Sequence, residues 1–157
     1  MKCLVALFLC LALPVAVFAA DSAPSFKIAY DGGSLPNIKA GAKLTLSVDS
    51  TSIRISDGKT EVANLAASSI TEVSYGQDVH RRIGAAIGLA VISLGIGALM
   101  ALTKSKKHFV GLTWADGDKK GGFAMQCDKN DYRGVLAALE GVTGKKAVNS
   151  DAMTVKN

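Results

Sequence analysis

Apolar and polar residues alternate with a period of two along much of this chain, which is the pattern of half-buried β-strands. Leu44, Leu46 and Val48, for example, alternate with polar residues. Asp57-Gly58 is typical of a tight hairpin turn because glycine accepts a positive φ. The pattern predicts about six or seven strands, at residues 26–30, 43–48, 52–56, 62–65, 70–75, 110–114 and 123–127.

The period changes to that of a helix near the C-terminus. One stripe at helical spacing consists of Tyr132, Val135, Leu136, Leu139 and Val142. Asp128 is a suitable N-cap, and Gly141 or Gly144 is expected to end the helix. Residues 145–157 show no periodicity and are predicted to form a flexible tail.

Strands followed by one amphipathic helix predict an α+β fold, an antiparallel β-barrel or curved sheet capped by the C-terminal helix. Residues 83–102 interrupt the pattern with twenty residues that carry no charge. As a helix they would extend about 30 Å, the thickness of the bilayer core. The segment therefore predicts an apolar membrane helix inserted between strands. Basic residues flank it on both sides and could reach the two interfaces: Arg81, Arg82, Lys104, Lys106 and Lys107.

Small residues recur within this segment at a spacing that lets two helices approach closely in lipid: Gly84, Gly88, Ser93, Gly97 and Ala101. A buried core helix or a glycine-loosened hairpin is the alternative, although glycines lower helix propensity in water. A single crossing would place the two parts of the sheet on opposite sides of the bilayer. We favour one intact domain over residues 21–144, because each part needs the other to bury its apolar face. The segment would then be re-entrant, a helical hairpin or a helix that lies on the membrane surface.

The N-terminus has the plan of a secretory signal over residues 1–20, with Lys2 before an apolar run and small residues at Ala19 and Ala20. The sequence thus predicts export to the cell envelope, with the periplasmic side of a membrane favoured. Removal of the signal leaves Cys127 as the only cysteine, so no disulfide can form within the chain.

Candidate chemistry is sparse in this sequence. His80 and His108 flank the apolar segment without a nearby cysteine, which makes a poor metal site. Asp116-Gly117-Asp118 resembles half of a calcium loop, but lysines follow it, so a hairpin turn explains it better. Cys127 shares a strand face with Phe123 and is expected to be a small core residue. We therefore predict no metal, no cofactor and no enzymatic activity.

Two stretches carry a resemblance to a known family. Residues 65–75, LAASSITEVSY, resemble a strand of bacterial pleckstrin-homology-like (GRAM-like) domains, and residues 132–144 are similar to the helix that closes one end of that barrel. The resemblance implies a PH-like domain. It does not extend to a phosphoinositide ligand, because the loop at residues 31–40 holds only one basic residue, Lys39.

These features lead us to expect a non-enzymatic, exported and membrane-associated binding or scaffold protein of the bacterial envelope. Its expected partners are membrane lipids and an envelope protein or a second copy, with no nucleic acid. The alternative is a membrane protein that acts through self-oligomerisation or permeability by way of its small-residue helix.

Overall fold

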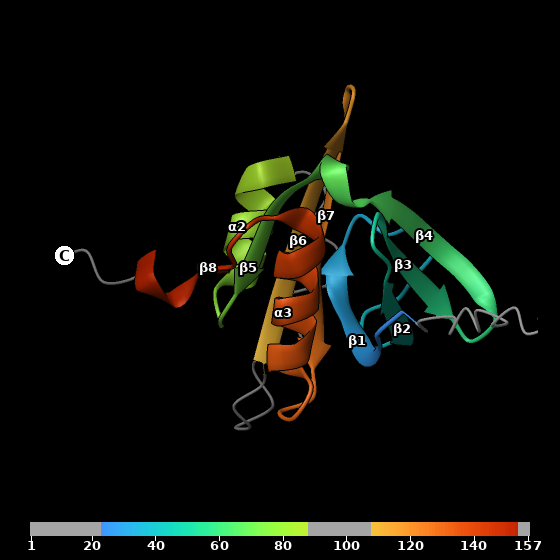
Figure 1. Cartoon of the computed structure of the whole chain (residues 1–157). Helices are drawn as coiled ribbons and strands as arrows, with labels where there is room; N and C mark the ends of the chain where they lie inside the picture. Colours follow the sequence, from blue (N-terminus) through green and yellow to red (C-terminus); the bar gives the residue numbers. More distant parts are fainter. Residues whose placement is uncertain (1–22, 88–107, 154–157) are drawn as a thin grey trace, which may run out of the picture.

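The computed structural model describes residues 23–87 and 108–153, which form one sheet and two helices (Figure 1). The predicted strands all form, with bounds β1 (Ser25–Gly33), β2 (Lys43–Val48), β3 (Ser52–Asp57), β4 (Thr60–Ala66), β5 (Ile70–Tyr75), β6 (His108–Asp116) and β7 (Lys119–Cys127). The other elements are β8 (Val148–Asn149), the helices α2 (Val79–Ile87) and α3 (Tyr132–Thr143), and the short 3-10 turns η2 (Ala67–Ser69) and η3 (Asp151–Met153). The predicted α+β class is therefore confirmed.

The strands lie in one eight-stranded mixed sheet with the order β4-β3-β2-β1-β7-β6-β5-β8. Neighbours are antiparallel except for β5 and β8, which run parallel. The sheet ends at β4 on one side and at β8 on the other, so it does not close, and the expected barrel is wrong. The alternating pattern could not reveal this, because closure depends on whether the two edge strands pair.

The main core lies between the sheet and α3. Alternate residues of the strands point into it, as the period of two requires, including Leu46, Ile53 and Val73. Val135 and Leu139 of α3 are fully buried against them. The helix contacts β2, β5, β6 and η2, so it bridges strands from both parts of the sheet (Figure 1).

The ends of α3 differ in how well the sequence predicts them. Gly144 ends the helix in the left-handed conformation at φ +67°, as expected for a glycine C-cap. The N-cap is Asp131 and not Asp128, and its side chain makes no capping hydrogen bond. The Asp128 carboxylate instead accepts a hydrogen bond from the backbone N–H of Asn130, in the turn before the helix.

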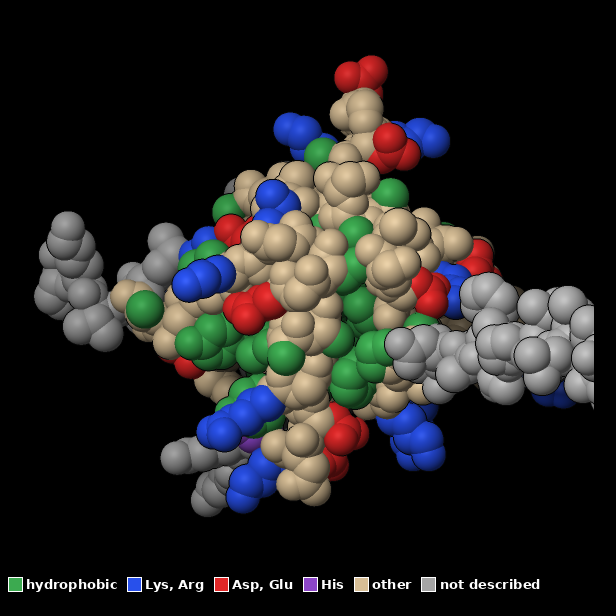
Figure 2. Space-filling model, in the orientation of Figure 1, with side chains coloured by type: hydrophobic (Ala, Val, Ile, Leu, Met, Phe, Trp, Pro, Cys, Tyr) green, Lys and Arg blue, Asp and Glu red, His purple; other side chains and the backbone are tan. Residues whose placement is uncertain are grey.

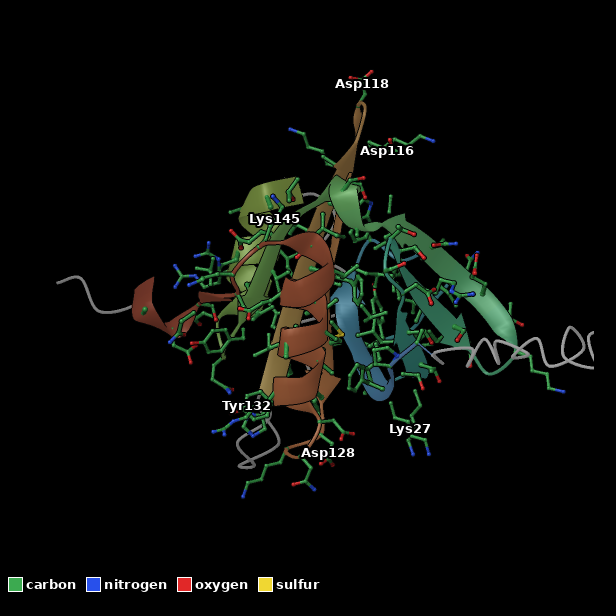
Figure 3. All side chains as sticks on the ribbon, viewed as in Figure 1. Lys27, Asp116, Asp118, Asp128, Tyr132 and Lys145 are labelled. Carbon is green, nitrogen blue, oxygen red and sulfur yellow. The ribbon has the colours of Figure 1, made fainter. Side chains whose placement is uncertain are left out.

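The hairpin between β6 and β7 projects beyond the sheet, with Asp116 and Asp118 at its tip (Figure 3). Acidic and basic side chains surround this tip together (Figure 2). Gly117 has φ +57° and Asp116 pairs with Lys119, so the segment is a tight turn and not part of a calcium loop.

Helix α2 forms a second, smaller layer on the opposite face of β6 and β7. Its buried residues Val79 and Ile83 pack with Phe109 and Ala124. Strand β6 is consequently buried on both faces over most of its length. This helix was not predicted from the sequence, because its apolar side runs directly into the uncharged segment.

The prediction of a membrane helix at residues 83–102 needs correction. Residues 83–87 are the last turns of α2, and Ile83 and Gly84 are buried in the protein. Across residues 23–87 and 108–153 we find no helix with both the length and the apolar character needed to span a bilayer. The apolar insert is therefore not supported as a membrane-crossing element. Residues 88–102 lie outside the described part of the chain, as does the predicted signal at residues 1–20.

Residues 147–151, which we call the C-terminal strap, lie within the predicted tail and contact the sheet. Val148 and Asn149 form β8 against Ser74 and Tyr75 of β5. Ser150, which follows them, is buried at 1% exposure. The strap therefore occupies the edge of the sheet that β5 would otherwise expose (Figure 1).

Candidate functional site

A cavity of about 500 Å³ opens beside α2, where that helix faces β5 and the C-terminal strap. Its volume lies within the range of small-molecule sites, roughly 300–1,000 Å³. The lining residues come from three separate segments: Glu72 from β5, Asp78, Arg81, Arg82, Ala85 and Ala86 from α2 and the residue before it, and Ser150 from the strap. Charges of both signs thus meet around one hollow.

Arg82 and Glu72 form the best-defined interaction in the cavity wall. The guanidinium Nε donates to Oε1 at 2.8 Å, and one terminal nitrogen donates to Oε2 at 2.7 Å, so the pair is bidentate. The hydrogen bond to Glu72 is the main cause that raises the pKa of Arg82. A bidentate pair fixes the orientation of both planar groups. Arg82 therefore ties α2 to β5.

The strap forms another wall of the cavity and also supports the start of α2. Ser150 donates its backbone N–H and its hydroxyl to the carbonyl oxygen of Tyr75, at 2.8 and 2.9 Å. The Asp151 carboxylate accepts hydrogen bonds from the backbone N–H groups of Gln77 at 2.6 Å and Asp78 at 3.3 Å. Asp78 directly precedes α2, so the strap adds a second carboxylate near the N-terminus of the helix, where negative charge is favourable.

Glycines allow α2 to lie close to the sheet beneath the cavity. A Cβ atom on Gly111 would lie 2.5 Å from Cγ1 of Val79, and one on Gly122 would lie 3.0 Å from Cγ2 of Ile83. Real Cβ atoms essentially never approach within 3.0 Å of another heavy atom. The glycine at position 111 is therefore required for the observed position of the helix.

His80 lies on α2 outside this cavity and approaches Asp31 of β1. Its Nε2 atom is 2.6 Å from Oδ2 of Asp31, and its ring meets Phe109 edge-on. Despite the short distance, neither ring nitrogen makes a well-directed hydrogen bond to a described residue. The contact is thus close but poorly aligned, and it does not provide the oriented carboxylate–histidine geometry that a general base needs.

The other residues with chemical potential lie elsewhere. His108 stacks on Tyr132, with ring centroids 4.1 Å apart and planes 4° apart. Cys127 is buried, and the loss of solvent around it raises the pKa of its thiol to about 12, so little reactive thiolate forms at neutral pH. Cys127 lies in the core with Phe123 and Met125, as predicted. The described residues hold no cluster of three or more potential metal ligands.

The sequence identified only part of this site. Arg81 and Arg82 were singled out for their position beside the apolar segment, and both line the cavity. Gly84, singled out within the apolar segment, is buried near the end of α2. The remaining predicted residues, Gly88, Ser93, Gly97, Ala101, Lys104, Lys106 and Lys107, lie outside the described part of the chain.

Glu72, Asp78 and Ser150 were missed. They are far apart in the sequence and match no motif. Only the repeat of apolar residues at Val79 and Ile83, one helical turn apart with charged residues between, could have indicated α2 and hence a site on its outer side.

Comparison with known proteins assigns no family to this arrangement. No protein-family model matches the chain, and no curated protein sequence matches it. The resemblance to PH-like domains therefore stays a prediction.

Proposed function

We propose that the protein is a non-enzymatic binding module of the bacterial envelope and that the cavity beside α2 holds its ligand. The observation that carries this proposal is a hollow of ligand size whose wall is made of charged side chains held in place by the protein. Arg82 is fixed by Glu72, and Ser150 is fixed by the backbone of β5. Such preorganised groups lower the entropy cost of binding a polar ligand.

The chemistry of the lining favours binding over catalysis. Ser150 is the only hydroxyl-bearing residue among those that line the cavity, and it donates to the carbonyl of Tyr75. A nucleophilic serine needs an adjacent base to take its proton. Both described histidines contact residues away from the cavity, namely Asp31 and Tyr132. Arg81 instead suits a ligand with an acidic group, since Arg82 is already paired with Glu72.

Export forms part of the proposal and rests on the signal-like pattern of residues 1–20. The alternative function, self-association through a small-residue helix, gains no support from the described residues, because Gly84 is buried.

The experiment compares the unmodified protein with two matched substitutions. Ala85 lines the cavity and is exposed on α2, so Ala85→Trp should fill the hollow. Ala137 is exposed on α3, and Ala137→Trp is the control. The probes are a dicarboxylate, a diamine, the dipeptide Gly-Gly and vesicles of phosphatidylglycerol. Binding of each probe is measured from the shifts of the backbone amide signals of the protein in NMR spectra.

We expect a carboxylate-bearing small probe to shift the amide signals of Arg81 and Ala85 in the unmodified protein and in Ala137→Trp. The same probe should leave the signals of Ala85→Trp unchanged. If no small probe shifts these signals, or if Trp at position 85 leaves the response intact, the cavity is not the binding site. Vesicle binding that persists in Ala85→Trp would equally contradict the proposal, because lipid would then contact another surface.

A further inference from the structure

The C-terminal strap is held against the sheet in the way that a bound peptide is held at a sheet edge. It pairs in parallel with β5, through Val148 opposite Ser74 and Asn149 opposite Tyr75. Peptides that add a strand to an exposed sheet edge gain affinity from the same backbone hydrogen bonds. The strap site consists of the β5 edge at Ser74 and Tyr75, the bend at Gly76 and the first backbone N–H groups before α2.

Two side chains of the strap give this site its selectivity. The Ser150 hydroxyl donates to the Tyr75 carbonyl at 2.9 Å, and the Asp151 carboxylate accepts the N–H group of Gln77 at 2.6 Å. The pairing through the backbone is independent of sequence, whereas the last position needs an acceptor for the N–H groups of Gln77 and Asp78, and a carboxylate near the helix start is the favourable one.

The bend at Gly76 is shaped to the strap. Gly76 has φ +123°, and a Cβ atom there would lie 2.4 Å from Oγ of Ser150 and 2.6 Å from Oδ1 of Asp151. The site therefore accommodates a hydroxyl and a carboxylate only because position 76 has no side chain. The contact is thus specific and not an incidental approach of the chain end.

The strap is nevertheless weakly anchored. Val148, Asn149 and Asp151 are exposed, Ser150 is buried, and Ala147 is half-buried, with its N–H donating to Glu140. A segment that buries so little apolar surface opens at a small free-energy cost compared with the core strands. The bonds that hold it are polar and can be reproduced by any other extended segment of the same chemistry.

We propose that the strap site binds an extended acidic segment of a partner protein and that the strap is its internal competitor. The inference rests on the proposed binding role and names the class of partner. The preferred segment has a small hydroxyl residue followed by an aspartate, as in Ser150-Asp151.

The test uses a labelled peptide of residues 147–153, AVNSDAM, and the same peptide with Asp replaced by Asn. The full chain is compared with Ser150→Ala/Asp151→Ala, which loosens the strap. The control is Ser68→Ala/Asp118→Ala, two exposed residues outside the strap. We expect the peptide to bind the loosened variant at least tenfold more tightly than the unmodified chain or the control, as measured by fluorescence anisotropy. The Asn peptide should bind it about threefold more weakly than the Asp peptide, because the amide keeps an acceptor oxygen but lacks the negative charge.

A second measurement does not depend on the variant. In the unmodified chain, excess peptide should shift the amide signal of Ser150 to the position it has in an unfolded chain, because the strap is displaced. The amide signal of Gln77 should stay where it is, because the Asp of the peptide replaces Asp151 as its acceptor. Equal affinity of both peptides, or an unchanged Ser150 signal at saturating peptide, would overturn the proposal. Dimers that exchange straps without binding free peptide would also overturn it, in favour of a second copy as the occupant.

The two proposals can fail separately. If Ala85→Trp abolishes binding of a small carboxylate probe but the peptide does not bind the protein, the cavity remains a ligand site and the peptide inference is wrong. If neither the small probes nor the peptide binds, the proposed function itself is wrong.

Discussion

Asp151 binds the turn that leads into α2 although it lies 74 residues away in sequence from Gln77, whose backbone N–H its carboxylate accepts at 2.6 Å. The same carboxylate accepts the N–H of Asp78, the residue directly before the helix. The C-terminal strap thus holds this turn in place, so the position of α2 and the attachment of the strap are coupled. Loss of either contact should weaken both.

This coupling predicts the effect of removing the carboxylate. Asp151→Ala should lower the free energy of unfolding by about 1 kcal/mol, because the N–H groups of Gln77 and Asp78 lose their acceptor. Asp151→Asn retains an acceptor oxygen and should lose less. Urea denaturation measures both changes. Asp118→Ala, at the exposed hairpin tip, is the control and should change stability by less than about 0.5 kcal/mol. An Asp151→Ala variant as stable as the unmodified chain would show that these hydrogen bonds contribute nothing.

The close packing of α2 on the sheet predicts opposite effects for two glycines. Gly111→Ala should destabilise the protein by about 1–3 kcal/mol, because its Cβ would overlap Val79 and the Ser74 hydroxyl. Gly141→Ala should stabilise it by about 0.5–1 kcal/mol, because position 141 is within α3 and its Cβ would meet no atom within 4 Å. Thermal unfolding of the two variants checks the pair. The same sign of change in both would contradict the packing described for α2.

The Arg82–Glu72 pair should contribute more than the other described pair of arginine and carboxylate. Its side chains are 19% and 32% exposed and form two hydrogen bonds, whereas those of Arg54 and Asp49 are 45% and 29% exposed and share one. In double-mutant cycles, Gln replaces Arg82, Glu72 and Arg54, and Asn replaces Asp49. The coupling energy should be about 1 kcal/mol for Arg82 with Glu72 and less than about 0.5 kcal/mol for Arg54 with Asp49. Added salt should weaken the second pair more. Equal coupling energies would contradict the greater rigidity inferred for Arg82.

Burial of Cys127 predicts a loss of stability at high pH. The folded protein keeps the thiol protonated up to about pH 12, whereas in the unfolded chain the thiol ionises near its usual pKa of 9.0. Between these values the unfolded state binds fewer protons, so the free energy of unfolding should fall by about 1.4 kcal/mol per pH unit from this group. Below pH 9 the group should have no effect. The difference between the pH profiles of the unmodified chain and Cys127→Ala isolates this contribution. Parallel profiles above pH 9 would mean that the thiol is accessible to solvent.

The strands and α3 could be predicted because each buries one face, and burial of one face imposes a period on the sequence. Leu44, Leu46 and Val48 are an example, since all three are buried in β2. The same reasoning failed at α2. Its apolar positions Val79 and Ile83 lead into an uncharged run, so a nine-residue amphipathic helix was merged with a membrane segment of twenty residues.

The site was largely unpredictable for a different physical reason. The strap is held by its backbone and by the polar groups of Ser150 and Asp151, and such contacts leave no hydrophobic pattern. Glu72 and Arg82 meet only because the turn at Gly76 returns the chain over β6 and β7. Contacts of this kind depend on the tertiary fold and carry no signal in a local window of sequence.

The pairing of β1 with β7 determines when this molecule can assemble. Ser34 and Gly122, 88 residues apart, are joined by three hydrogen bonds at the end of that pairing. Strand β1 therefore cannot pair with β7 until nearly the whole chain has left the ribosome. Contacts that close such long loops also form slowly. A chain that finishes folding so late stays unfolded during most of its synthesis. A translocation channel that passes unfolded polypeptides requires this of its substrates.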